Sequence, residues 1–185
     1  EVNLEQIGFL GAYDKKDLLI NVATVLTSAG KSVLIVDATS VQRMRYVVPN
    51  ISTNQSFSYV SEYAKIDVAL GFMTLNNVAQ YLRRNLDYDY ILIDSDNPQT
   101  MNSFGIQGMK KIFFVTSYEQ YDMLKGAELL RFVQMPIEVV KVISTTNMND
   151  AEDKLLNSKV TNSNIKWSNS RVEFSDSDVD RRAIL

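Results

Sequence analysis

The residues that could do chemistry lie first in a loop near the start of the chain, between an apolar run and a helical one. This segment, Ile7–Asp17, reads IGFLGAYDKKD. A loop that binds phosphate needs glycines that turn backbone N–H groups inward, a lysine for the phosphate charge, and a Ser or Thr hydroxyl for Mg²⁺. Gly11 and Lys15 supply part of this set. The segment therefore has the position, and some of the residues, of a phosphate-binding loop.

Three changes in the same loop oppose that chemistry. If Lys15 is the phosphate lysine, Asp14 replaces the glycine before it and Lys16 replaces the hydroxyl after it, while Phe9 replaces an earlier glycine. A carboxylate repels phosphate, an ammonium group has no lone pair for a metal, and residues other than glycine do not freely adopt positive φ. The residues of this loop therefore determine whether the chain has a working nucleotide site or an inactive one.

Two aspartates form the second set of candidates, because each ends an apolar β-branched run. The runs are Val33–Asp37 and Tyr90–Asp94. In open parallel sheets, ligands bind at the carboxyl ends of the strands, so both carboxylates could face the same crevice as the loop. A strand that ends in aspartate is also an ordinary turn signal. Taken together with the loop, the pair is more specific than either aspartate alone.

The elements that must position these residues alternate between β-branched runs and runs of helical period. This pattern predicts an α/β fold, a three-layer sandwich with a mostly parallel central sheet flanked by helices. The predicted strands are Gln6–Leu10, Ser32–Asp37, Tyr90–Asp94, Lys111–Thr116 and Val139–Ser144, and the predicted helices are Lys16–Ala29, Thr74–Asn85 and Gln120–Phe132. Gly30 is a suitable glycine to end the first helix.

Two regions are less regular. Residues 39–67 should contain loops and short strands. The polar end of the chain should contain short strands at Ile165–Trp167 and Arg171–Phe174, and a helix that starts around Asp178. We expect residues 1–185 to form a single domain, truncated at one or both ends if the sequence is part of a longer protein.

Composition excludes several classes of function. The chain has no cysteine and no histidine, which excludes disulfides, thiol nucleophiles, Cys/His zinc sites and histidine proton shuttles. A net charge of −3 gives no general basic field for DNA. No apolar run approaches the roughly twenty residues that span a bilayer. We therefore expect a cytoplasmic protein without an integral membrane segment.

The order of these segments resembles the ParA/MinD class of P-loop ATPases, which has a deviant Walker A motif. The resemblance is carried by the loop, the helix after it, GKSVLIVD at residues 30–37, and YDYILID at residues 88–94. It runs from about Ile7 to Ser144 and implies a P-loop NTPase-like fold. It also implies that Asp37 positions water and metal and that Asp94 is the Walker B carboxylate. Asn147 matches loosely the position that reads the adenine base.

The departures from this family concern its central chemistry. The family loop is Gly-Lys-Gly-Gly-x-Gly-Lys-Ser/Thr-Thr, and residues 9–17 here are FLGAYDKKD. Only Gly11 and Lys15 match. Leu10 replaces the signature lysine, which in the family reaches across a dimer to the partner's nucleotide. We therefore assign no catalytic residue, and we expect Lys15 to be a solvated charge at a helix start.

Two functions remain open on this sequence. The first is an inactive ParA/MinD-like module without a cofactor, a homodimer that binds or positions a protein partner in a pilus, secretion or partition machine and that a partner recruits to the membrane. Some relatives it resembles are the CpaE/TadZ proteins of pilus assembly. The alternative is an active ATPase with a remodelled loop, acting in positioning or DNA partition. Its ATP and Mg²⁺ would be bound by Gly11, Lys15, Asp37, Asp94 and Asn147, with Asp37 and Asp94 at the metal.

Overall fold

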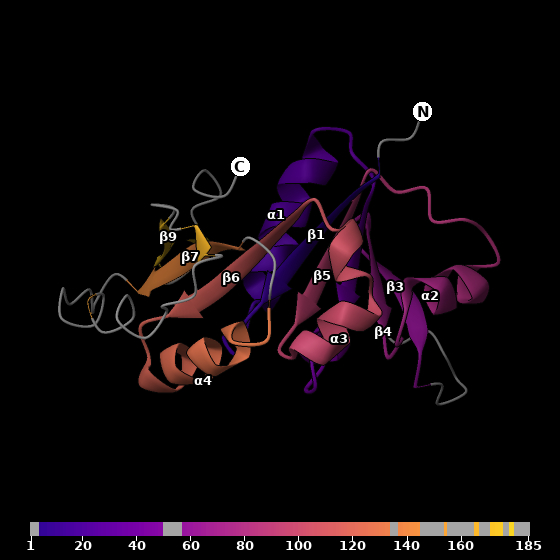
Figure 1. The fold of residues 1–185 in the computed structure, drawn as a ribbon. Helices are drawn as coiled ribbons and strands as arrows, with labels where there is room; N and C mark the ends of the chain where they lie inside the picture. The colour runs from indigo at the N-terminus through magenta and orange to yellow at the C-terminus, as the bar shows by residue number, and fades with distance from the viewer. Residues whose placement is uncertain are drawn as a thin grey trace.

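A single mixed sheet forms the centre of the molecule (Figure 1). The computed structural model describes residues 4–49, 57–133, 137–144, 154, 165–166, 171–175 and 178–179. Within these residues the strands are β1 (Glu5–Leu10), β2 (Val33–Asp37), β3 (Tyr59–Tyr63), β4 (Ile66–Leu70), β5 (Tyr90–Ser95), β6 (Lys111–Ser117), β7 (Ile137–Ser144), β8 (Ile165–Lys166), β9 (Arg171–Ser175) and β10 (Asp178–Val179). The helices are α1 (Lys16–Ser28), α2 (Leu75–Leu82), α3 (Pro98–Ser103) and α4 (Gln120–Leu130), with 3₁₀ turns η1 (Arg43–Tyr46) and η2 (Ile106–Gly108).

The strand order places the N-terminal strand in the middle of the sheet. The order is β10-β9-β7-β6-β1-β5-β2-β4-β3, with β8 also paired to β7. Strand pairs are parallel except β3 with β4 and β9 with β10. Because β1, β2 and β5 run in one direction, the loops that follow them meet at one edge.

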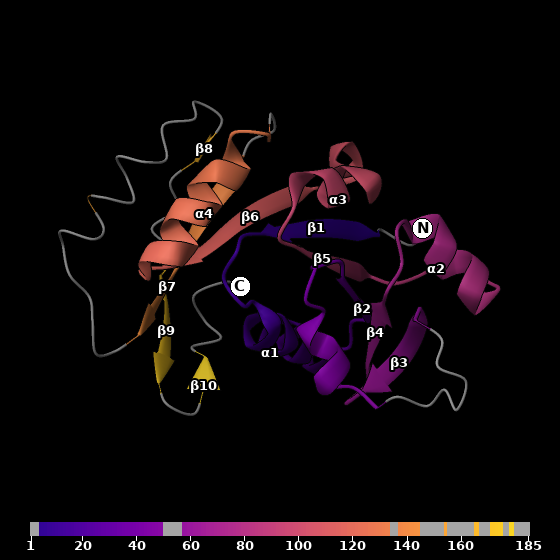
Figure 2. The same cartoon turned by 90° about the horizontal axis from the view of Figure 1, so that it is seen from below.

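Helices cover both faces of this sheet, which gives three layers. Figure 2 shows α3 and α4 on one face and α1 on the other. The core is divided accordingly: side chains of α2, α3 and α4 pack in one apolar cluster, and those of α1 and η1 in a second. Since both faces are covered, β2 is buried along its whole length. The predicted three-layer α/β fold is therefore confirmed.

The ends of the helices follow local chemistry. Thr74 precedes α2, and its side chain accepts a hydrogen bond from the Asn77 N–H, so the helix starts one residue later than predicted. Arg83 has a φ of 56° and ends α2 before Asn85. Gly30, with a φ of +81°, follows α1 as predicted.

Two details of the prediction need correction. A helix was expected to start around Asp178, but Asp178 and Val179 form strand β10, which pairs antiparallel with Ser175 and Phe174 of β9, and residues 180–185 lie outside the described residues. Cross-strand pairing thus overrides the local helical pattern. Helix α3 was not predicted. It begins at Pro98, and the Asn97 side chain caps it by accepting from the Gln99 N–H.

Among the described residues, no helix combines the length and the apolar character that a membrane span requires.

Candidate functional site

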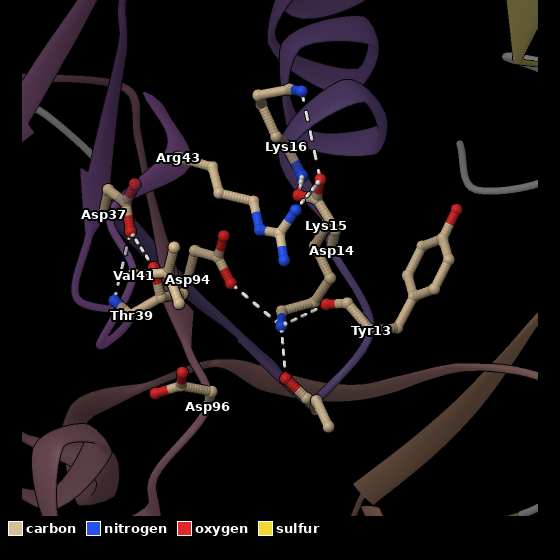
Figure 3. A pocket seen from close by; sticks show the side chains of 12 residues that line it. Tyr13, Asp14, Lys15, Lys16, Asp37, Thr39, Val41, Arg43, Asp94 and Asp96 are labelled. Carbon is tan, nitrogen blue, oxygen red and sulfur yellow. Dashed lines mark hydrogen bonds and ion pairs between the residues drawn. The ribbon is translucent and has the colours of Figure 1, made fainter. Parts of the chain in front are cut away.

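The loop after β1 and the ends of β2 and β5 meet in one pocket, as the sequence predicts. Asp37 and Asp94 are direct neighbours in the register of β2 and β5. The hollow has about 370 Å³ of empty space, part of it open to solvent. Its lining is Gly11, Ala12, Tyr13, Asp14, Lys15, Lys16, Asp37, Thr39, Val41, Arg43, Asp94 and Asp96, most of which Figure 3 labels. Asn147 lies outside the described residues.

Gly11 fixes the path of the loop as it leaves β1. Its φ is +152°, and a Cβ at this position would lie 2.3 Å from the carbonyl oxygen of Val115 in β6. Its N–H donates to the Ser95 carbonyl oxygen at 3.1 Å. A side chain therefore does not fit between the loop and the neighbouring strand, which explains glycine at this point.

Lys15 is not the solvated charge that we expected from the sequence. Only 1% of the residue is exposed. Its Nζ donates to the carbonyl oxygens of Gly11 at 2.6 Å and Tyr13 at 3.1 Å, and lies 3.1 Å from Asp94 Oδ1. Figure 3 shows these three contacts converging on the ammonium group. The loop folds back over its own lysine, because a buried ammonium must be paired and hydrogen-bonded.

Asp94 is the buried partner of this ammonium group. Burial raises the pKa of its carboxyl to about 7; Lys15 lowers that pKa and the nearby Asp37 adds to the increase. The Oδ1 atom has no hydrogen-bond partner, although Lys15 Nζ is close enough for an ion pair. The contact thus compensates charge without an aligned hydrogen bond.

Asp37 is engaged by its own loop. Its Oδ1 accepts from the N–H and the hydroxyl of Thr39 at 3.1 and 2.6 Å, and its Oδ2 accepts from the Met44 N–H at 3.1 Å. These bonds tie the end of β2 to η1. In this arrangement Asp37 organises the loop that carries Arg43.

Asp14 lies at the N-terminus of α1. Its Oδ1 accepts from the Lys16 N–H at 3.1 Å. Its Oδ2 lies 3.6 Å from Arg43 Nη1 and 3.9 Å from Lys16 Nζ. Arg43 was not among the predicted site residues, because nothing in its spacing along the sequence shows that η1 would bring it to the loop.

Leu10 is the last residue of β1, and Asp96 lines the pocket from the loop after β5. Leu10 is fully buried in the core, so the side chain at this position points away from solvent. Asp96, in the loop after β5, accepts from the Ser40 N–H at 3.1 Å and from its hydroxyl at 2.6 Å. Asp96 therefore joins the loop after β5 to the loop after β2.

The residues present do not fit ATP with Mg²⁺ in this arrangement. The ammonium of Lys15 is engaged by the protein, a carboxylate accepts from the first N–H of α1, and Lys16 offers no hydroxyl to a metal. The geometry instead gives a loop that satisfies most of its charges internally.

The sequence matches no protein-family model and no curated protein. Solved structures do match it. A ParA family ATPase from Chlorobium tepidum TLS has a TM-score of 0.60 and 14% identity, over 95% of this chain and 86% of that chain. A chain of the MinC:MinD cell division protein complex from Aquifex aeolicus has a TM-score of 0.52 and 16% identity, over 82% of this chain and 72% of that chain.

A third solved structure of similar fold is named as a synthase. Cobyrinic acid a,c-diamide synthase from Mycobacterium smegmatis has a TM-score of 0.60 and 11% identity, over 86% of this chain and 82% of that chain. The fold and the loop together place this chain in the P-loop NTPase class of folds. Within that class it has the fold of the ParA/MinD ATPases. At these identities the likeness concerns the fold alone, and function has to be argued from the site.

Proposed function

We propose that this chain is a catalytically inactive ParA/MinD-like module, which binds or positions a protein partner within a larger assembly of the pilus, secretion or partition type. It works without nucleotide. The observation that carries this proposal is the state of Lys15, whose buried ammonium group is held by two carbonyl oxygens of its own loop and by Asp94.

The energetics of that ion pair oppose exchange for a nucleotide. Breaking a buried ion pair by removing one partner costs about 3–5 kcal/mol, because the other charge stays buried without compensation. In a working site a metal ion would compensate the Walker B carboxylate, but here Lys16 occupies the position of the metal-binding hydroxyl. A nucleotide that drew Lys15 away from Asp94 would therefore leave that carboxylate uncompensated.

Leu10 removes a second part of the family mechanism. The signature lysine of the family reaches the nucleotide of a partner subunit, and this position is here an apolar side chain within the core. No side chain at this point can bridge two subunits through nucleotide. Association and partner binding are then properties of the folded surface.

Partner binding is supported by the fold. A chain with this fold is part of the MinC:MinD cell division protein complex. This chain has the sheet and the helices of the fold, although its loop lacks most of the glycines of the family motif. This combination supports a role in which the folded surface binds a partner and no phosphate chemistry takes place.

One observation favours an alternative, an active ATPase with a remodelled loop in positioning or DNA partition. Gly11, Lys15, Asp37 and Asp94 line one pocket, as a nucleotide site requires. In that case ATP and Mg²⁺ would have to displace Lys15 from Asp94 and Asp14 from the start of α1.

Titration calorimetry with ATP and Mg²⁺ separates the two functions. We expect no saturable heat from the wild-type protein at micromolar concentrations. Lys15→Ala and its neighbour Lys16→Ala provide matched variants, since both remove one ammonium group from the same loop but only Lys15 is buried. Micromolar binding that Lys15→Ala abolishes and Lys16→Ala retains would overturn the inactive module in favour of the ATPase.

A further inference from the structure

The surface around η1 combines exposed aromatic and apolar side chains with arginines. Tyr46 is 85% exposed and Phe57 is 68% exposed, and Val41 is exposed beside them in the sequence of the turn. Arg43 and Arg45 belong to the same 3₁₀ turn as Tyr46. Val41 and Arg43 also line the pocket described above (Figure 3). We call these five residues, Val41, Arg43, Arg45, Tyr46 and Phe57, the η1 surface.

Contacts within the chain hold this surface in place. Arg45 joins its two segments, since its Nη2 donates to the Phe57 carbonyl oxygen at 2.8 Å and its guanidinium carbon lies 4.9 Å from the centre of the Phe57 ring. Met44, between the two arginines, is fully buried, and its N–H donates to Asp37 Oδ2 at 3.1 Å. The exposed side chains therefore stand on a turn that is anchored in the core, which lowers the cost of ordering them when a partner binds.

The composition of the η1 surface is typical of the centre of a protein interface. Aromatic residues and arginine are enriched there, whereas lysine and acidic residues are depleted. Between Asp37 and Glu62 the charged residues are Arg43 and Arg45, in a chain whose net charge is −3. Single exposed apolar residues need no explanation, but several that share one surface with arginines indicate an interaction site.

We propose that the η1 surface binds a protein segment that carries carboxylates beside apolar side chains. This inference rests on the proposed function and deepens it, because it names the surface that is used and the kind of partner. The apolar side chains of the partner pack on Tyr46 and Phe57, and a carboxylate pairs with Arg43. The contact of Arg43 with Asp14, at 3.6 Å, is long and lies at the surface, and a guanidinium group has five N–H donors, so a second carboxylate can bind.

Charge disfavours two other occupants. A second copy that bound through the same surface would bring the arginines of both copies together, because a two-fold interface pairs a surface with itself. A nucleic acid is a long polyanion, and the carboxylates of Asp14 and Asp96 line the pocket next to this surface. A protein segment with a few carboxylates opposite the arginines avoids both kinds of repulsion.

The test is a titration of the full ¹⁵N-labelled chain with synthetic peptides at low salt. One peptide contains Glu, Leu and Phe, a second contains Glu and Ser, and a third contains Lys, Leu and Phe. We expect saturable binding of the Glu/Leu/Phe peptide alone, with the largest amide shifts at residues 41–46 and at Phe57. Added salt should weaken this binding, because the arginines contribute through their charge.

Two variants have matched controls elsewhere on the surface. Tyr46→Ala should weaken binding of the Glu/Leu/Phe peptide about tenfold, whereas Tyr121→Ala, at an exposed tyrosine of α4, should leave it unchanged. Arg43→Glu should also weaken it about tenfold, and Arg131→Glu, the same charge reversal at the exposed end of α4, should not. All four side chains are exposed, so the variants should fold, and the same spectra check this.

Several results would overturn the proposal. These are no saturable binding of the Glu/Leu/Phe peptide, equal binding of the Lys/Leu/Phe peptide, tighter binding of a thymidine oligonucleotide, and shifts confined to α4. Equal effects of Tyr46→Ala and Tyr121→Ala, or of Arg43→Glu and Arg131→Glu, would overturn it too. Shifts at residues 41–46 on dilution of the protein alone would overturn it in favour of a second copy. Failure of the proposed function would look different, as ATP binding in calorimetry, whatever the peptides do.

Discussion

A buried ion pair between Lys15 and Asp94 is the main electrostatic contact of this site. Lys15 and Asp94 are both buried, and each is the main compensating charge of the other. The ion pair forms because the loop residues Gly11 and Tyr13 turn their carbonyl oxygens toward Lys15. At the scale of single residues, the ammonium group of the loop lysine is thus held by contacts within the protein.

The raised pKa of Asp94 predicts a dependence of stability on pH. The pKa rises from the usual 3.8 to about 7 on folding, chiefly because the carboxyl is buried. The folded protein therefore holds this proton more tightly than the unfolded chain does. The contribution of Asp94 to stability is largest below about pH 4 and falls as the pH rises toward 7, by at most about 1.4 kcal/mol per pH unit for one proton.

Urea unfolding of wild type and Asp94→Asn at pH 5, 6 and 7 measures this contribution. The wild type should lose free energy of unfolding relative to the variant as the pH rises across this window. Asp17→Asn, which removes an exposed carboxylate, should follow the wild type. Parallel stability curves for wild type and Asp94→Asn would show that Asp94 does not titrate in this range.

At the scale of elements, helix α4 approaches the sheet closely through a glycine. A Cβ on Gly126 would lie 2.4 Å from Cζ of Phe114, which is fully buried in β6. Glycine inside a helix costs about 1 kcal/mol relative to alanine, so its presence needs a reason in packing. The Phe114 ring provides that reason.

Gly126→Ala should therefore destabilise the protein although alanine is the better helix former. Overpacking costs about 1–3 kcal/mol, which exceeds the gain in helix propensity at all but the lower end of that range. Thermal unfolding checks this, and Phe114→Leu in the same chain should recover part of the loss. Gly108→Ala is the control, because its Cβ would meet no heavy atom closer than 3.9 Å. A Gly126→Ala protein as stable as wild type would contradict the proposed close packing.

At the scale of the whole molecule, the sheet order explains why distant parts of the sequence share one site. Strand β1 lies between β5 and β6, and β5 lies between β1 and β2. The register pairs Phe9 with Asp94 and Asp94 with Asp37, so the loop and both aspartates meet at the same edge. The position of the site is thus a consequence of the sheet topology, which proteins of the same fold have in common. Only the residues that line the site are particular to this chain.

The proposed module should form a homodimer whose stability does not depend on nucleotide. With Leu10 inside the core, no lysine is available at this position to reach a nucleotide of the partner subunit. Sedimentation velocity with and without ATP and Mg²⁺ should give the same dimer. A strict monomer at high protein concentration would contradict the homodimer, and a dimer that appears only with ATP would favour the ATPase.

The sequence determined the alternation of strands and helices and the edge at which the site lies. Two strongly apolar strands, Val33–Asp37 and Tyr90–Ser95, are typical of a parallel sheet that is covered on both faces. Because parallel strands end at the same side of a sheet, Asp37 and Asp94 meet there. The local periodicity of the sequence is a weaker signal for short helices and strands. Asn97 and Pro98 begin helix α3, which is only six residues long. Asp178 lies in strand β10 because it pairs with β9, a segment whose pairing no local pattern indicates.

Only the tertiary structure decided what the charged residues do. Lys15 reads from the sequence as an exposed charge at a helix start, and it is buried because the loop carbonyls and Asp94 surround it. No local pattern in the sequence marks Arg43, and η1 brings its guanidinium group to 3.6 Å from Asp14. The physical reason is that the energy of a charge depends on its partners and its burial, which are set by segments distant in the chain, whereas strand and helix formation depends on local periodicity.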